Sequence, residues 1–306
     1  MMRAMPATPD SMKIFDRVLH ARHRARAAAG FADHDFLLAR VAEDMADRLG
    51  IITREFPRAL DLGAHHGFIN KMLPLMEAGK VGHVVTTDLA PEMLAQASGA
   101  RVCATEEQLP FADKSFDLVV SALSLHWAND LPGALIQIRR ALAPDGLFIG
   151  AMFGGETLIE LRQALAEAEI ECEGGLSPRV SPFADLRDMG GLMQRAGFAL
   201  PVIDSDRVTV NYGNMLKLLA ELRGMGETNA LIERRRTPLR RSTLMRAAEI
   251  YSRKFGLADG RIPATFEIVM LAGWSPHERQ QKPLRPGSAK AKLADALGTI
   301  EHKAPR

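Results

Sequence analysis

The stretch 58–88 constrains the fold of this chain more than any other part of the sequence. A short apolar run over 59–62 ends at Gly63, apolar residues at helical spacing follow over 68–76, and a second apolar run ends at Asp88. This order predicts a strand, a glycine turn, a helix and a second, parallel strand. Ligands of open parallel sheets bind beyond the carboxyl ends of the strands, so we expect the turn and Asp88 to face one crevice.

Composition limits the kind of partner and the compartment. The 39 Lys and Arg residues nearly balance the 37 Asp and Glu residues, and the formal net charge of +2 is too small to favour nucleic acid as a partner. Cys103 and Cys172 do not have the spacing of a metal site, so we expect ordinary thiols in a reducing compartment. No apolar run approaches the roughly 20 residues that span a bilayer. We therefore predict a cytoplasmic protein without an integral membrane segment.

The length of the chain allows one large domain with a sizeable apolar core. Residues 1–11 lack the apolar core of a secretory signal and are predicted to be a disordered lead-in. Residues 279–306 are rich in basic residues and proline and are predicted to be a flexible tail. The domain between them is expected to consist of N-terminal helices, a ligand-binding core and a substrate and lid half, over residues 12–50, 51–154 and 155–278.

Strand and helix patterns alternate as far as about residue 153, which is the signature of a doubly wound α/β sheet. After the first unit, the apolar patterns predict strands over 100–104, 116–122 and 147–153, with helices over 91–97 and 131–142. Two helices at 11–29 and 36–49 precede the first strand. They could fold over the crevice as a lid or cover one edge of the sheet, and the sequence leaves both interpretations open.

The second half of the chain has a different order of predicted helices and strands. Helices are predicted over 157–171 and 185–196, and two strand-like runs, 200–204 and 207–212, are expected to pair as an antiparallel hairpin at one edge of the sheet. A helical insertion and a last apolar strand follow, over 215–223, 242–255 and 265–272.

The glycine turn favours one class of ligand over another. Asp88 follows the turn at the spacing of an acid that accepts both hydroxyls of a ribose. A dinucleotide site would need G-x-G-x-x-G, whereas here the sequence Ala-His-His at 64–66 separates Gly63 from Gly67. The pattern D-x-G-x-G-x-G fits better, with Asp61 near a ligand ammonium group and glycines that let the backbone approach the amino-acid part of the ligand.

Five segments resemble, in their order and spacing, the motifs of class I S-adenosylmethionine-dependent methyltransferases. They are LDLG at 60–63, TDLAPEML at 87–94, EEQLPF at 106–111, SFDLVVSALSLHW at 115–127 and LAPDGLFIGAMFG at 142–154. The ordered spacing carries the resemblance, because each segment alone is unspecific. The resemblance implies a doubly wound, mostly parallel seven-stranded α/β sheet with an antiparallel edge and a helical lid insertion. It also implies S-adenosyl-L-methionine as the cofactor.

The resemblance also assigns roles to residues around the crevice. Asp88 would hold the ribose, Leu89 and Met93 would flank the adenine, and the segment 104–106 would meet the adenine edge. The implied cofactor-binding residues are Asp61, Gly63, Ala64, Gly67, Asp88, Leu89, Met93, Thr105 and Glu106.

Further segments narrow the resemblance to the mitochondrial complex I assembly factor 5 proteins and their bacterial relatives. These segments are FDR at 15–17, LSLHWANDLP at 123–132, GAMFGGETLIELR at 150–162, EGGLSPRVSPF at 173–183, VNYGNMLKLLAELRGMGETN at 210–229 and IPATFEI at 262–268. The resemblance runs over about 12–288. It implies a protein substrate in respiratory complex I and a place near the inner membrane during assembly. A member of that family is associated with arginine hydroxylation.

Two positions depart from the methyltransferase pattern. His65 stands where the third motif residue is usually glycine, and we expect its side chain to crowd the methionine part of the cofactor or to force the loop outward. Thr105 stands where an acid usually contacts the adenine amine, which leaves Glu106 as its substitute.

His126 follows a predicted strand at the place where such enzymes put groups near the transferred methyl. It is the candidate catalytic base, and the alternative is that it only shapes the pocket. His65 and His66 are adjacent and should point apart, so we predict no metal site. The arginines of 234–241 and the glutamates of 160–173 are interpreted either as solvated faces or as docking sites for a protein of opposite charge.

Three functions remain open from the sequence. The first is methyl transfer from S-adenosylmethionine to an unidentified acceptor, and the second is hydroxylation of a protein arginine on the same fold. The third is a non-catalytic assembly module whose cofactor site has degenerated at His65 and Thr105.

Overall fold

The computed structural model describes residues 13–72, 76–183 and 186–281. The chain divides into two compact units, Met1–Pro276 and His277–Arg306. All helices and strands below belong to the first unit. In the second, the described residues form a turn in which the Gln280 N–H donates to the His277 carbonyl at 3.2 Å. The predicted lead-in 1–11 and most of the predicted tail lie outside the described residues.

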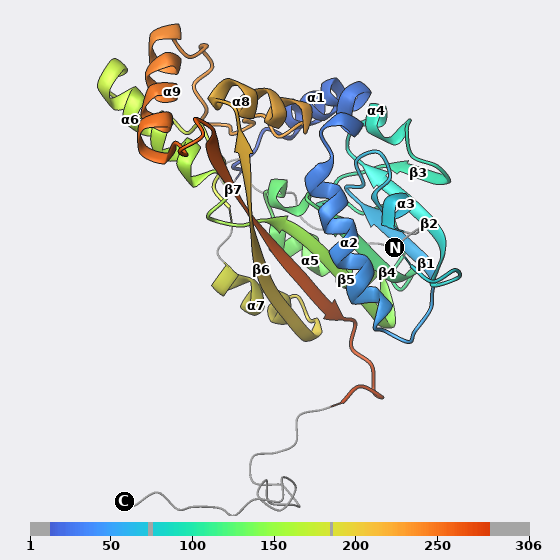
Figure 1. Cartoon of the computed structure of the whole chain (residues 1–306). Coiled ribbons are helices and arrows are strands. Elements are labelled where there is room, and N and C mark those ends of the chain that lie inside the picture. The colour runs from blue at the N-terminus through green and yellow to red at the C-terminus, as the bar shows by residue number, and fades with distance from the viewer. Residues whose placement is uncertain (1–12, 73–75, 184–185, 282–306) are drawn as a thin grey trace, which may run out of the picture. The chain divides into compact units, whose positions relative to one another are not determined.

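One seven-stranded sheet runs through the described part of the chain, in the order β3-β2-β1-β4-β5-β7-β6 (Figure 1). Strands β1 to β5 are parallel to their neighbours, and β7 is antiparallel to both β5 and β6. This arrangement confirms the predicted fold class. The strands are β1 Phe56–Leu62, β2 Val81–Asp88, β3 Ala100–Cys103, β4 Phe116–Ala122, β5 Leu142–Phe153, β6 Ala199–Tyr212 and β7 Ile262–Trp274.

The helices fall close to the predicted positions. They are α1 Arg17–Ala27, α2 Phe36–Gly50, α3 Phe68–Met72, α4 Pro91–Leu94, α5 Leu131–Ala141, α6 Ile159–Glu173, α7 Leu186–Arg195, α8 Met215–Gly224 and α9 Arg241–Phe255. Two short 3-10 helices, η2 Ala28–Asp33 and η4 Leu125–Trp127, follow α1 and β4. None of the helices in the described residues is long and apolar enough to cross a membrane.

Alternating side chains of the strands feed two apolar cores. In β4, Leu118 and Val120 face the core that contains α2 and α3, whereas Val119 faces the core that contains α5 and α7. Successive side chains of a strand point to opposite faces, so an uninterrupted apolar strand is the expected sequence for a sheet covered on both sides. Helices α6, α8 and α9 also contribute side chains to the first core.

The predicted hairpin at the sheet edge is wrong. Residues 199–212 form one continuous strand, β6, which pairs with β7 from Ala199 opposite Trp274 to Tyr212 opposite Ile262. The polar sequence Asp204-Ser205-Asp206 looked like a turn but lies in the middle of this edge strand. Its carboxylates are held by α2 instead, through ion pairs from Arg48 to Asp204 and from Arg40 to Asp206, each 2.7 Å.

Of the two N-terminal helices, one packs against the sheet and the other lies over the crevice, so each takes one of the two roles that the sequence left open. Helix α2 packs on a face of the sheet through Leu37, Met45 and Leu49. Helix α1 lies with α4 and α8 at the end of the molecule where the parallel strands terminate (Figure 1). Asp16 is its N-cap and accepts a hydrogen bond from the Leu19 N–H at 3.0 Å. Helix α1 is therefore the one that covers the crevice.

The packing of β4 generates a stability prediction. Leu118 is fully buried between β1 and β5, and Leu118→Ala should lower the free energy of unfolding by about 2–5 kcal/mol, because it leaves a cavity. Denaturant unfolding measures this change. The control is Ile51→Ala at a side chain that is 85% exposed, which should change stability by less than about 0.5 kcal/mol. Equal effects of the two variants would contradict the described core.

Candidate active site

The glycine turn after β1 joins the ends of β1 and β2. Gly63 and Gly67 have φ angles of 65° and 101°, and His65 between them has a φ of 56°. The Ala64 N–H donates to the Thr87 carbonyl at 2.8 Å, which fixes the turn against β2. A Cβ atom on Gly63 would lie 2.0 Å from the Oγ of Ser124. The position therefore requires glycine for space as well as for backbone conformation.

Asp61 lies below this turn and is fully buried. Its Oδ2 accepts a hydrogen bond from the Ile69 N–H at 2.9 Å, while its Oδ1 has no hydrogen-bond partner among the described residues. Burial, together with the charge of Asp88, raises the pKa of Asp61 to about 7 despite the backbone hydrogen bonds. A positively charged ligand group would satisfy the free acceptor.

Asp88, at the C-terminal end of β2, is paired with Arg24 of α1. The Nε of Arg24 lies 3.2 Å from Oδ1, and its Nη2 donates to Oδ2. The same two oxygens accept the N–H groups of Ala90 and His65, at 2.9 Å and 3.0 Å. Burial by itself lowers the pKa of Arg24, but the charge and hydrogen bonds of Asp88 outweigh it, and the pKa is raised. The carboxylate that was expected to hold a ribose is bound to α1.

His65 and His66 point in different directions. The Nε2 of His65 lies 3.0 Å from the Ala122 carbonyl, and its ring stacks on Phe31 of η2 with the centroids 5.1 Å apart. The Nε2 of His66 lies 3.1 Å from the Oδ2 of Asp35. Burial, followed by the charge of Arg24, lowers the pKa of His65 well below its ordinary value, so the ring is neutral. The side chain at the missing glycine position is held between η2 and the end of β4.

Glu106 points back over the glycine turn. It accepts hydrogen bonds from Ser124 and from Arg17 of α1, and its Oε1 would lie 2.9 Å from a Cβ atom on Gly63. Burial raises the pKa of Glu106, but Arg17 and then Ser124 outweigh it, and the net pKa is lowered. Arg17 and Arg24, which lie about two turns apart on α1, thus bind two of the three acids expected to hold the cofactor.

The remaining predicted cofactor residues lie around this cluster. Leu89 directly follows Asp88 and is 9% exposed, and Met93 is fully buried in α4 with the core that contains α2. Thr105 is half-buried and forms an isolated β-bridge with Gln108.

A fourth acid, Glu227, was not predicted from the sequence. Its Oε2 accepts a hydrogen bond from the Nε1 of Trp127 at 2.9 Å and lies 3.2 Å from the Nε2 of His126. The side chain of His126 is only 1% exposed and lies against Glu227. The sequence signal was present in the segment AELRGMGETN at 220–229, but no local pattern linked that segment to η4.

A mostly apolar cavity of about 500 Å³ lies beside Trp127 and Glu227. Its apolar walls come from α6, α8, β7 and the segment before α7, and include Leu161, Phe183 and Leu219. Glu227 is the one acidic residue among the described residues that line it, and Arg179 and Arg223 are the basic ones. Arg179 is paired with Glu169. The apolar walls can hold a long apolar stem, and Glu227 can bind a cationic head, as in arginine or lysine.

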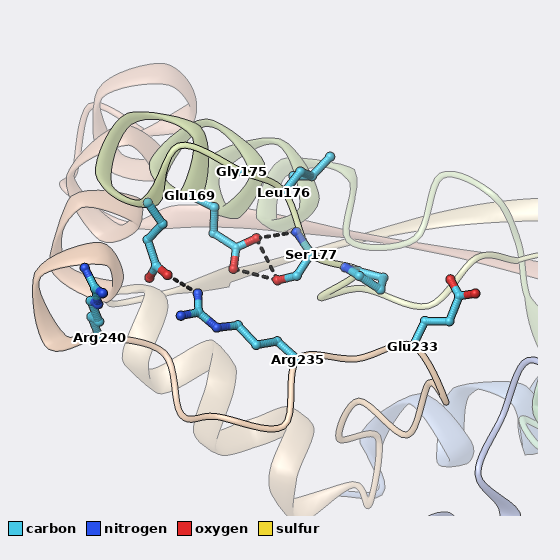
Figure 2. Close-up of a pocket in the computed structure, with 9 residues that line it drawn as sticks. Glu169, Gly175, Leu176, Ser177, Glu233, Arg235 and Arg240 are labelled. Carbon is cyan, nitrogen blue, oxygen red and sulfur yellow. Dashed lines mark hydrogen bonds and ion pairs between the residues drawn. The ribbon is translucent and has the colours of Figure 1, made fainter.

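A second pocket, of about 420 Å³, lies near α6 and α9 and is polar (Figure 2). Glu169 accepts hydrogen bonds from Ser177, at 2.9 Å from its N–H and 2.7 Å from its hydroxyl, and is also paired with Arg179. The neighbouring Glu173 is bound by Arg235 and by the Thr243 hydroxyl. The chain's own residues satisfy these acids, so this pocket is a structural clamp.

Several acids of the predicted charged run 160–173 are paired within the chain. Glu171 pairs with Arg246 of α9, and Glu167 pairs with Arg253 and Lys254 of the same helix. These ion pairs join α6 to α9. In the part of the chain that the structure describes, no group of three metal-binding side chains comes together.

Comparison with known proteins identifies the family to which the chain belongs. A methyltransferase domain matches residues 60–150. The human mitochondrial protein named arginine-hydroxylase NDUFAF5 is 43% identical over 305 residues, which cover 97% of this chain and 87% of the human protein. Its zebrafish counterpart is 43% identical over 93% of this chain and 89% of the relative. The chain belongs to the NDUFAF5 family.

Other relatives place the NDUFAF5 family within a wider group. A malonyl-[acyl-carrier protein] O-methyltransferase of Halorhodospira halophila is 35% identical over 87% of this chain and 90% of that protein. The YcgJ protein of Bacillus subtilis superposes with a TM-score of 0.53 at 16% identity, over 78% of this chain and 99% of the other, which shows a shared fold. The predicted resemblance is confirmed, and the methyltransferase domain supports the expected cofactor. The similar NDUFAF5 proteins are named mitochondrial, so the predicted cytoplasmic location stays a prediction.

The raised pKa of Asp61 generates a prediction of pH dependence. In the folded protein Asp61 keeps its proton up to about pH 7, whereas in the unfolded chain it loses it near pH ~4. The folded state therefore binds more protons between these values, and the stabilisation present below pH ~4 is lost as the pH rises through the folded pKa.

Asp61→Asn should remove this part of the pH dependence of the free energy of unfolding. Denaturant unfolding at a series of pH values measures it, and the control is Asp47→Asn at an exposed carboxylate of α2. An unchanged slope in Asp61→Asn would show that Asp61 ionises normally.

Proposed function

We propose that this protein binds S-adenosyl-L-methionine and modifies an arginine side chain of another protein. The observation that carries the proposal is the cavity beside Trp127, where Glu227 meets apolar walls. The Oε2 of Glu227 is bound by Trp127 and His126, while its Oε1 makes no hydrogen bond among the described residues. An inserted guanidinium would donate to this oxygen and lie near the Trp127 ring, which favours cations.

The cofactor residues fit the group that the methyltransferase domain implies. The unpartnered Oδ1 of Asp61 would meet the ammonium group of the cofactor, and Gly63 would let the backbone approach its amino-acid part. Asp88 would accept the ribose hydroxyls once Arg24 has moved away, with Leu89 and Met93 near the adenine. Glu106 and Thr105 would border the cofactor. When bound, S-adenosylmethionine supplies a sulfonium methyl group as an electrophile.

Hydroxylation of the arginine is the first candidate reaction. The relatives that are 43% identical over nearly the whole chain, including the half that lines the cavity, are named arginine hydroxylases. Hydroxylation converts one C–H bond of the arginine to C–OH. With dioxygen as the oxidant, the second oxygen atom would leave as water, with two electrons from an external reductant and two protons. By the same family relation, we propose a subunit of respiratory complex I as the protein substrate.

Methyl transfer to the arginine is the second candidate, favoured by the methyltransferase domain over residues 60–150. It would proceed by in-line displacement, in which the cavity aligns a guanidinium nitrogen with the methyl carbon. For this reaction we propose that His126 positions Glu227, which is the pocket-shaping alternative that the sequence left open.

Mass spectrometry of complex I subunits separates these reactions. Cells that lack the gene should lose one modification on an arginine, and the intact cells should show either one added oxygen atom or one added methyl group at that residue. An unmodified arginine in the intact cells, with complex assembly failing in the deletion strain, would instead support a non-catalytic assembly role.

Glu227→Gln, restored to the deletion strain, should lower the modification rate by roughly tenfold to a hundredfold, because a charged hydrogen bond to the guanidinium is lost. The matched control is Glu233→Gln, an exposed glutamate at the polar pocket of α6 and α9. Full modification with Glu227→Gln would remove the basis of the proposed substrate class.

The state of Asp61 provides a test of cofactor orientation. At pH 6 the free protein carries a proton on Asp61, and a cofactor ammonium beside it should lower this pKa and release the proton on binding. Calorimetry with S-adenosylhomocysteine in two buffers of different ionisation enthalpy measures the proton release. Asp61→Asn should abolish it, and equal release by this variant would place the ammonium elsewhere.

A further inference from the structure

We infer that Arg24 is a latch, by which helix α1 closes the cofactor site until the ribose of the cofactor displaces it. The inference concerns the regulation of the proposed cofactor site and rests on that proposal. It makes α1 a competitor of the cofactor rather than a fixed wall of its site.

The hydrogen bonds of Asp88 carry the inference. An ionised carboxylate offers about four lone-pair positions. Arg24 takes one on each oxygen of Asp88, and the N–H groups of Ala90 and His65 take the other two. The backbone groups are fixed by the turn, so two ribose hydroxyls can bind this carboxylate only when the guanidinium leaves.

The contacts of Arg24 in the closed state hold its side chain only weakly. Arg24 is completely buried, yet its Nη1 has no hydrogen-bond partner among the described residues. A buried donor without an acceptor costs free energy, which is recovered when the side chain reaches water. An ion pair that is removed from water also adds little net stability, because desolvation of both charges opposes their attraction. Ribose hydroxyls that replace the guanidinium donors can therefore compete with it.

Helix α1 connects this latch to the substrate cavity. Arg17 donates to Glu106 and to the Trp127 carbonyl, the latter at 2.8 Å, and the His20 ring stacks on the Trp127 ring at a centroid distance of 4.2 Å. Trp127 in turn donates to Glu227. A movement of α1 that frees Asp88 thus also moves the His20 ring away from Trp127, which borders the cavity.

The segment that carries Glu227 is hydrogen-bonded to the N-cap and to a side chain of the same helix. The Asp16 N–H donates to the Ala230 carbonyl at 2.8 Å, and the Nδ1 of His23 lies 3.1 Å from the Thr228 carbonyl. Opening the latch would therefore pull on the wall of the substrate cavity. Through these contacts, cofactor binding and substrate binding are coupled.

Calorimetry with S-adenosylhomocysteine tests the latch. Arg24→Ala should bind this probe at least about tenfold more tightly than the unaltered protein, because the fraction of open sites rises. Arg24→Gln, which keeps most of the volume but not the charge, gives the same direction and serves if the alanine variant is too unstable. The matched control is Arg22→Ala, an exposed arginine of the same helix, which should leave the affinity unchanged.

Fluorescence of Trp127 reports the movement independently. The chain has two tryptophans, so a Trp274→Phe background isolates Trp127. Addition of the probe should change the emission and speed hydrogen exchange in α1, and Arg24→Ala should show both changes before the probe is added.

The outcomes separate the two proposals. Binding to the unaltered protein with no tighter binding by folded Arg24 variants would overturn the latch and leave the cofactor proposal standing. Binding by an Arg24 variant alone would support both. No binding by any folded variant would overturn the cofactor proposal and the latch together.

Discussion

The buried ion pair between Arg24 and Asp88 is the interaction on which the rest of the site depends. A charged carboxylate at the end of a parallel strand, fully removed from water, needs a cation or several donors. Arg24 supplies the cation, and the N–H groups of His65 in the glycine turn and of Ala90 after β2 are the two backbone donors. Burial, together with the charge of Asp88, raises the pKa of the neighbouring Asp61 to about 7, so Asp61 keeps its proton at pH values below that.

Most of the fold followed from local patterns in the sequence. Strand β4 was predicted with the observed bounds, since a strand covered on both faces is apolar without interruption. Strand β6 was not, because Asp204 and Asp206 have the polarity of a turn and are compatible with a strand only through their partners on α2. Edge strands carry such polar residues where another element covers them. The error therefore arose from a contact between distant parts of the chain.

The candidate site divides in the same way. Asp61, Gly63 and Asp88 could be found because a glycine turn between two strands is a local signal. Arg24, Arg17 and Glu227 could not, since each binds a partner 64, 89 or 100 residues away, and no periodicity of the sequence reports such pairs. The family resemblance included the segments FDR and GMGETN, which contain Arg17 and Glu227. It gave no role to Arg17, Arg24 or Glu227.

The charges of the site argue for the ligands proposed. Asp61, Asp88 and Glu106 surround the glycine turn, and Glu227 lies beside the apolar cavity, so each of these acids can bind a positive group. In the closed state α1 provides them as two guanidinium groups. The cofactor brings a sulfonium and an ammonium group, and an arginine substrate brings another guanidinium. A dinucleotide would instead bring a pyrophosphate beside these acids and would be repelled. Helix α1 thus places positive groups where the proposed cofactor and substrate would place theirs. For this reason α1 can neutralise the acids in the closed state and can be displaced by these ligands.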